Sequence, residues 1–129
     1  MNSGIEALTT TSLSLALDAA SLRHQVIAAN IANAGSRDFV PQRLSFEAQL
    51  DNAMRGMTTV HRESNSDQVA VQLNMRIEPD VGPDGRPRQV GLDTEVAAMS
   101  QNSLHYQALL KGLNRHLSVL ATAVSDGKR

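Results

Sequence analysis

Apolar residues follow a heptad repeat at both ends of this chain, and the middle of the chain has no such repeat. From Leu92 to Val124 the apolar positions alternate steps of four and three, interrupted only by Ser103, and the same alternation runs from Ile5 to Ala29 with smaller side chains. This repeat keeps one stripe of a helix facing a partner helix, so we expect the two ends to pair with each other or with neighbouring molecules. The pattern indicates assembly rather than catalysis. The predicted assembly seam comprises Leu8, Leu15, Leu22, Val26, Leu92, Val96, Met99, Tyr106, Leu110, Leu113, Leu117 and Leu120.

Composition excludes several functional classes. The chain has 129 residues, enough for one domain, and its net charge of -1 provides no field that would attract nucleic acid or an anionic membrane. Aromatic residues make up 2% of the sequence, whereas the pockets of enzymes usually depend on bulky aromatic side chains. Cysteine is absent, so disulfides and thiolate metal sites cannot form. The sequence shows neither a signal-peptide pattern nor an apolar run near the ~18 residues of a membrane span, so we expect no cleaved signal and no membrane insertion.

Helix signals define both ends of the chain. The first helix is predicted over 4–33, with Gly35 expected to stop it in a left-handed C′ conformation. Residues 9–12 are Thr and Ser, each costing up to ~0.7 kcal/mol relative to Ala in a helix, so we expect this helix to be stable only when packed. The second long helix is predicted to begin with Asp93 as its N-cap and Glu95 in its first turn.

Smaller elements are predicted between the two helices. Residues 38–41 should be extended, because the residue before a proline avoids the α region. A short helix is predicted over 45–56, and alternation over 69–77 predicts a half-buried strand that could pair with residues 86–90 in a hairpin. We therefore predict a mainly α fold, in which the long N- and C-terminal helices pair as a coiled-coil-like hairpin. A short helix and a small β-hairpin or irregular segment lie between them. The predicted organisation is a discontinuous terminal-helix unit, residues 1–35 and 91–126, and a middle segment, residues 36–90.

The polar residues give no pattern typical of an enzyme, a cofactor site or a metal site. His105 and His116 project from nearly the same side of the predicted helix but are ~16 Å apart along it, too far to share one metal ion. His105 and the following Lys111-Gly112 pair are faintly similar to a histidine phosphotransfer helix. Their spacing of six, however, turns the lysine away from the histidine. We therefore predict no catalytic, cofactor-binding or metal-binding residues and no small-molecule substrate.

Two asparagines at the end of the first helix require a specific explanation. Asn30 and Asn33 are three residues apart, and asparagine is a mediocre helix former. Their amides could bond the carbonyl groups left free at the helix end, which is ordinary C-terminal capping. Alternatively, they could lock two chain segments or two subunits together where the chain turns toward Phe39.

Residues at both ends of the chain resemble a known family. Ala29-Asn30-Ile31-Ala32-Asn33, followed by a turn and the aromatic Phe39, resembles the signature of bacterial flagellar basal-body rod and hook proteins. In that signature a helix ends in Ala-Asn-x-x-Asn, and a turn similar to Thr-Pro-Gly-Tyr follows. The segments 90–95 and 102–107, followed by the leucine seam, are similar to the C-terminal half of the same family. Here residues 36–39 are Ser-Arg-Asp-Phe, so the usual proline of the turn is missing. The residues that match the family motif are Asn30, Asn33, Phe39 and Asn102.

The resemblance and the short chain length together imply a structural subunit of the proximal rod, part of the drive shaft that transmits torque across the periplasm. The implied partners are copies of the chain, other rod subunits, a rod-to-ring adaptor and the flagellar type III export apparatus, which would export the chain without a cleaved signal. No cofactor is implied. The alternative function is a free-standing helical adaptor or phosphotransfer-like module.

Overall fold

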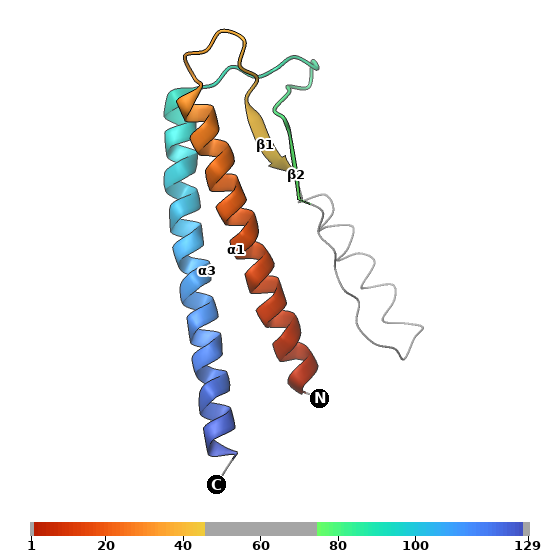
Figure 1. Ribbon diagram of the computed structural model, residues 1–129, viewed down its shortest axis with the longest axis vertical. Helices are drawn as coiled ribbons and strands as arrows, with labels where there is room; N and C mark the ends of the chain where they lie inside the picture. Colours follow the sequence, from red (N-terminus) through yellow and green to blue (C-terminus); the bar gives the residue numbers. More distant parts are fainter. Residues whose placement is uncertain (1, 46–74, 128–129) are drawn as a thin grey trace, which may run out of the picture.

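Two long antiparallel helices form the body of the protein. The computed structural model describes residues 2–45 and 75–127. The two helices lie side by side along their lengths, both chain ends lie at one end of the hairpin, and the loops lie at the other end (Figure 1). This arrangement confirms the predicted mainly α fold with paired terminal helices. The described elements are α1 (Asn2–Ala32), β1 (Gln42–Ser45), β2 (Arg76–Pro79) and α3 (Leu92–Asp126).

One face of α1 packs against α3. The carbonyl oxygen of Ala20 accepts a hydrogen bond from Asn102 Nδ2 at 2.8 Å, and Ala20 is only 1% exposed. A Cβ on Gly112 would lie 4.0 Å from Leu13 Cδ2, so Leu13 also faces α3. Leu13, Ala20 and the buried Ile27 are spaced by seven residues, which places them on one stripe of the helix. The small Ala20 allows the backbones to approach closely at the middle of the hairpin.

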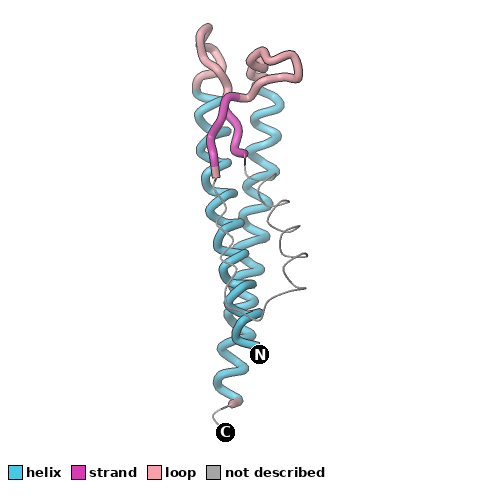
Figure 2. The backbone as a smooth tube through the Cα atoms, turned by 90° about the vertical axis from the view of Figure 1, so that its right-hand side faces the viewer, coloured by secondary structure: helices cyan, strands magenta, loops and turns pink. Residues whose placement is uncertain are grey.

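A second face of α1 packs against the sheet. Asn30 hydrogen-bonds to the first residue of β1, and Ala19 and Val26 lie on the same side of the helix as Asn30 because they precede it by eleven and four residues. All three side chains are buried. Figure 1 shows β1 beside the C-terminal half of α1 on the side away from α3, and Figure 2 shows that the strands cover only the loop end of the helices.

The sheet consists of β1 and β2 in antiparallel register, with Gln42 opposite Pro79 and Ser45 opposite Arg76. Arg43 and Glu78 are cross-strand partners and form an ion pair at 2.8 Å. The strand predicted over 69–77 therefore overlaps β2 only at residues 76 and 77, and residues 69–74 lie outside the described part. Ser45, the first residue of the helix predicted over 45–56, is instead the last residue of β1. The other residues of that predicted helix lie outside the described part of the chain.

The predicted pairing of β2 with residues 86–90 is wrong. Only one isolated bridge, Val81 with Pro87, forms there among the described residues, because Pro87 has no N–H to continue a ladder. A tight turn precedes it: Gly82 N donates to Arg86 O at 2.8 Å, and Gly85 adopts a φ of 73°. Past the turn, Arg88 N bonds to the carbonyl of Asp80, which carries the chain back toward α3.

The helix ends differ in detail from the predictions. The bounds of α1 agree with the predicted helix to within two residues, but Gly35 does not adopt a positive φ. Two backbone hydrogen bonds end α1 instead. Asn33 N donates to Ala29 O and Ser36 N donates to Asn33 O, so a left-handed cap is not required. Asp93 is not the N-cap of α3, because Glu95 N donates to the carbonyl of Gly91 and thereby starts the helix at Leu92.

No helix within residues 2–45 and 75–127 combines the length and the apolar character needed to cross a membrane.

We expect Ala20→Leu to lower the free energy of unfolding by about 1–3 kcal/mol, because Ala20 is buried against α3 and a larger side chain does not fit there. The measurement is the urea midpoint followed by far-UV circular dichroism. Ala28→Leu makes the same change at an exposed position of α1 and serves as the control. Equal midpoints for the two variants would contradict the helix packing described above.

Candidate functional site

The side-chain amide of Asn30 connects three separate segments of the chain. Its Oδ1 accepts a hydrogen bond from Gln42 N at 2.9 Å, and its Nδ2 donates to Gln42 O at 2.9 Å. The second hydrogen of Nδ2 points to Glu95 Oε2 at 3.3 Å, in the first turn of α3. Asn30 is 3% exposed, and all of its amide groups are used. We call this set of contacts between Asn30, Gln42 and Glu95 the Asn30 junction.

The backbone at Pro41 and Gln42 has hydrogen-bonding groups that match the Asn30 amide and the neighbouring strand. Pro41 has no N–H, so Gln42 provides the first backbone donor of β1. The Asn30 amide offers one acceptor and one donor to the two backbone groups of Gln42, as a neighbouring strand would. Meanwhile the carbonyl of the buried Pro41 accepts a bond from Asp80 N at 2.8 Å, which anchors the other side of the segment.

Asn33 has a different role from Asn30. Its Nδ2 donates to the carbonyl of Ala29 at 2.8 Å, which also accepts the Asn33 backbone N–H, so the side chain adds a second bond to the last turn of α1. The two roles left open by the sequence are therefore divided: Asn30 locks chain segments together, and Asn33 caps the helix. A turn follows in which Phe39 N donates to Ser36 O at 3.3 Å, so the chain turns here without the proline usual in the resembling family. Phe39 is half-buried.

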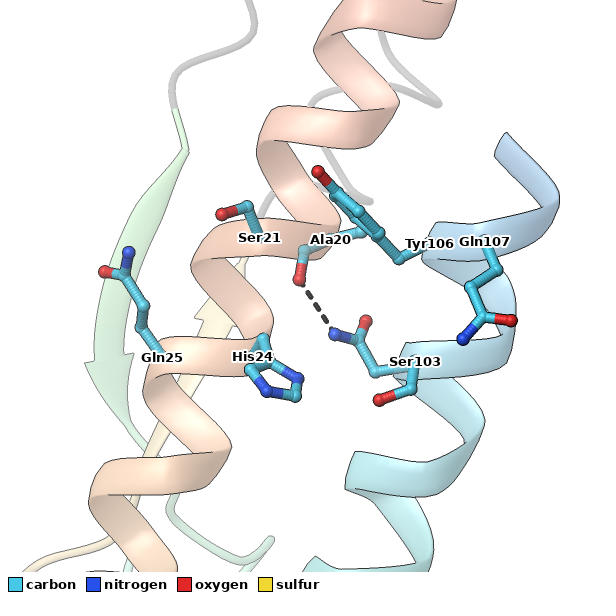
Figure 3. A pocket seen from close by; sticks show the side chains of 8 residues that line it. Ala20, Ser21, His24, Gln25, Ser103, Tyr106 and Gln107 are labelled. Atoms are coloured by element: carbon cyan, nitrogen blue, oxygen red, sulfur yellow. Dashed lines mark hydrogen bonds between the residues drawn. The ribbon is translucent and has the colours of Figure 1, made fainter. Parts of the chain in front are cut away.

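Asn102 is buried at the middle of the helix pair. It is 5% exposed, and its Nδ2 bonds to the Ala20 carbonyl across the interface (Figure 3). Its Oδ1 is buried without a hydrogen-bond partner in the described part of the chain. The bond crosses a shallow groove lined by uncharged polar and aromatic side chains. The groove residues are Ala20, Ser21, His24, Gln25, Asn102, Ser103, Tyr106 and Gln107.

The predicted seam of α3 is only partly used within the chain. Met99, Leu113 and Leu120 are half-buried at the edge of the face that packs on α1. The centre of that face is occupied by Asn102, together with the half-buried Leu109. The exposed members of the seam form a second stripe beside this face, which we call the α3 stripe. It comprises Leu92, Val96, Leu110, Leu117 and Val124.

The predicted seam of α1 lies away from α3. Val26 is buried on the sheet side of the helix, Leu15 and Leu22 are half-buried, and Leu8 is 48% exposed. Leu15 is two residues from Leu13, so it is turned by about 200° around the helix axis from the side that faces α3. The heptad repeat therefore identified an apolar stripe of α1 that differs from the stripe in contact with α3.

The histidines show no arrangement typical of a metal or catalytic centre. His24 and His105 are exposed, and His61 lies outside the described residues. His116 is half-buried between the helices, and its Nε2 has no hydrogen-bond partner there. No group of three or more potential metal ligands occurs within residues 2–45 and 75–127. Arg88 pairs with Asp80 of its own chain, with 3.6 Å between Nε and Oδ1.

Comparison with known proteins gives two informative relatives. The chain is 26% identical over 123 residues to the flagellar basal body rod protein FlgB of Bacillus subtilis, covering 93% of the chain and 95% of that protein. It is 32% identical over 117 residues to the protein of the same name from Aeromonas hydrophila, covering 84% of the chain and 86% of that protein. The chain belongs to the FlgB family of flagellar basal-body rod proteins. No protein-family model matches it. The FlgB assignment confirms the resemblance that the helix-end and C-terminal motifs indicated.

The partners of Asn30 and Asn102 had little or no signal in the sequence. Gln42 contributes to the Asn30 junction through its backbone, so its side chain carries no pattern that could reveal the contact. Ala20 accepts the Asn102 bond through its carbonyl and is one of many alanines in α1. For Glu95 the sequence contained part of the information. It predicted an acidic residue in the first turn of the helix, but it did not predict the contact of Glu95 with Asn30.

We expect Asn30→Ala to destabilise the Asn30 junction by about 1–3 kcal/mol, because both part-buried hydrogen bonds with the backbone of Gln42 are lost. Asn33→Ala is the matched control, since it removes a single bond and should cost about 0.5–1.5 kcal/mol. Hydrogen–deuterium exchange at the Gln42 amide should accelerate in Asn30→Ala and change little in Asn33→Ala. Equal protection in both variants would show that the junction does not hold β1 in place.

Proposed function

We propose that this FlgB-family chain is a structural, non-enzymatic subunit of the proximal rod in the flagellar basal body, part of the drive shaft that transmits torque across the periplasm. The α3 stripe carries this proposal. It extends from Leu92 to Val124 along α3, and its five members are exposed in the described part of the chain. Contiguous apolar surface of this extent is typical of an interface with other proteins.

Burial of the α3 stripe against neighbouring subunits would stabilise the assembly. A fully buried leucine or valine contributes about 1.5–3 kcal/mol relative to an exposed one, before the entropy of ordering is subtracted. Leu110 and Leu117 are 41% and 47% exposed, so each retains part of this contribution for an intermolecular contact. Several such side chains on each copy would hold a rod together without covalent links.

The small internal core fits export in an unfolded state. The buried apolar side chains among the described residues are Ala19, Ala20, Val26, Ile27 and Leu44, and none of them is aromatic. With so little internal burial, the hairpin is easily unfolded and threaded. We infer that the flagellar type III export apparatus carries the chain from the cytoplasm without a cleaved signal. Other rod subunits and a rod-to-ring adaptor are the further partners.

The alternative function, a free-standing helical adaptor or phosphotransfer-like module, requires a stable monomer. Such a module buries its apolar stripe within its own bundle, whereas the α3 stripe lies outside the described hairpin. His105 is exposed, but Lys111 follows it by six residues and lies on another side of α3. The following two experiments distinguish the functions.

Mass spectrometry of purified hook–basal bodies from the source bacterium, after acid removal of the filament, should detect this chain at a stoichiometry near that of other rod subunits. The matched sample is the soluble cytoplasmic fraction of the same cells. Recovery only from that fraction, as a folded monomer, would contradict a role in the rod and favour the helical module.

We expect Leu110→Asp to abolish rod assembly and motility, because a carboxylate in the middle of the α3 stripe cannot be buried against a neighbour without a partner. Export of the variant should remain measurable in the culture medium, since Leu110 is not part of the buried core. Leu104→Asp is the matched control: Leu104 is on the same helix, is 72% exposed and lies away from the stripe. Normal basal bodies with Leu110→Asp would exclude the α3 stripe as an assembly surface.

A further inference from the structure

The side of α3 that packs on α1 carries polar residues at its centre. Steps of seven residues from the buried Asn102 keep nearly the same face of the helix, and they reach Glu95 and His116, which are half-buried. Glu95 contacts Asn30 at 3.3 Å. Asn102 Oδ1 and His116 Nε2 are buried without a hydrogen-bond partner in the described part of the chain. Turning this side inward therefore costs free energy.

The α3 stripe is the neighbouring and more apolar side of the same helix. Leu110 follows Asn102 by eight residues, so it lies about 80° around the helix axis from Asn102. The members of the α3 stripe are all apolar, and they are exposed. If apolar burial alone decided how α3 is rotated, this stripe would face α1, because that rotation would remove more apolar area from water. The observed rotation therefore has another cause.

A hydrogen bond in the middle of the helix pair supplies this cause. Asn102 Nδ2 donates to the Ala20 carbonyl at 2.8 Å, and both residues are buried (Figure 3). A helix carbonyl has a second lone pair and can accept this additional bond. Ala20 has only a methyl side chain, whereas Leu13 and Ile27, seven residues away on either side, are larger. A polar side chain within a helix seam specifies one arrangement at a cost in stability.

We propose that Asn102 selects the face of α3 that turns inward and thereby keeps the α3 stripe on the outside of the hairpin. A rotation that brought Leu110 toward α1 would carry the Asn102 amide away from the Ala20 carbonyl and break their bond. Asn102 is thus a positioning residue, which determines the apolar side chains that α3 presents to other molecules. The consequence for assembly rests on the proposed function, in which neighbouring subunits cover the α3 stripe.

Cysteine reporters at two adjacent positions test the rotation of α3, since the chain contains no cysteine. Leu109→Cys reports the inner face, where Leu109 is half-buried. Leu110→Cys reports the α3 stripe, where Leu110 is 41% exposed. The measurement is the rate at which iodoacetamide alkylates each thiol in the purified full-length chain. With Asn102 present, the thiol at position 110 should react faster than the thiol at position 109.

Asn102→Leu should reverse the order of the two alkylation rates, because apolar burial then turns the α3 stripe inward. Gln101→Leu is the matched control: it adds a leucine at the adjacent, exposed position and should leave the order unchanged. A substitution that merely loosens the hairpin would accelerate the reaction of both thiols, and one that merely tightens it would slow both. Either result without a reversed order, or no change in the rates, would overturn the proposed role of Asn102.

Incorporation into basal bodies separates the role of Asn102 from the proposed function. Asn102→Leu, without the reporters, should be recovered from purified basal bodies in smaller amounts than Gln101→Leu, because its α3 stripe is turned inward. A reversed order of alkylation with normal incorporation would support the selection of the inner face by Asn102 and contradict the α3 stripe as an assembly surface. An unchanged order with normal incorporation would overturn the role of Asn102 and leave the proposed function intact.

Discussion

The hydrogen bonds of the Asn30 amide with the backbone of Gln42 are the interaction on which the geometry of the described structure depends. They place β1 against α1, and through the antiparallel register they also place β2. The additional contact with Glu95 fixes the start of α3 at the same point. Because a buried amide must be satisfied on all sides, the three segments can meet in only a few arrangements. One side chain near the end of α1 thus determines where the chain leaves the helix and where it returns.

Close packing of small residues gives the hairpin a narrow interior. Ala19 and Ala20 are among its most buried residues, and the Asn102 amide occupies the middle of the helix interface. This interior brings the helices together without burying many large side chains. Most of the large apolar residues of α3 consequently remain on the surface. Within the described residues, these side chains leave apolar area available for contacts with other molecules, which is consistent with the family of rod proteins to which the chain belongs.

Periodicity predicted the existence of the helices better than their packing. The heptad repeats located α1 and α3 to within a few residues. They did not identify the face of α1 that contacts α3, because α1 carries two apolar stripes, each with a spacing of seven residues. One stripe contains Leu13 and Ala20, and the other contains Leu15 and Leu22. The stripe with the larger side chains gave the stronger pattern, whereas the helices meet along the stripe that contains Ala20. Pro87 likewise explains why the chain after the turn does not form the predicted second strand.

The sequence by itself determined the two long helices, the unusual pair of asparagines at the end of α1 and the resemblance to flagellar rod proteins. Each of these is a local property, set by helix propensity, turn chemistry or a short motif. The tertiary structure decided which apolar stripe is internal, which asparagine locks and which caps, and that β1 rather than residues 86–90 pairs with β2. These features depend on contacts such as Asn30 with Glu95 and Ala20 with Asn102, between residues far apart along the chain. Local periodicity contains no information about such distances, so only the packed helices and the bonds between them select one arrangement.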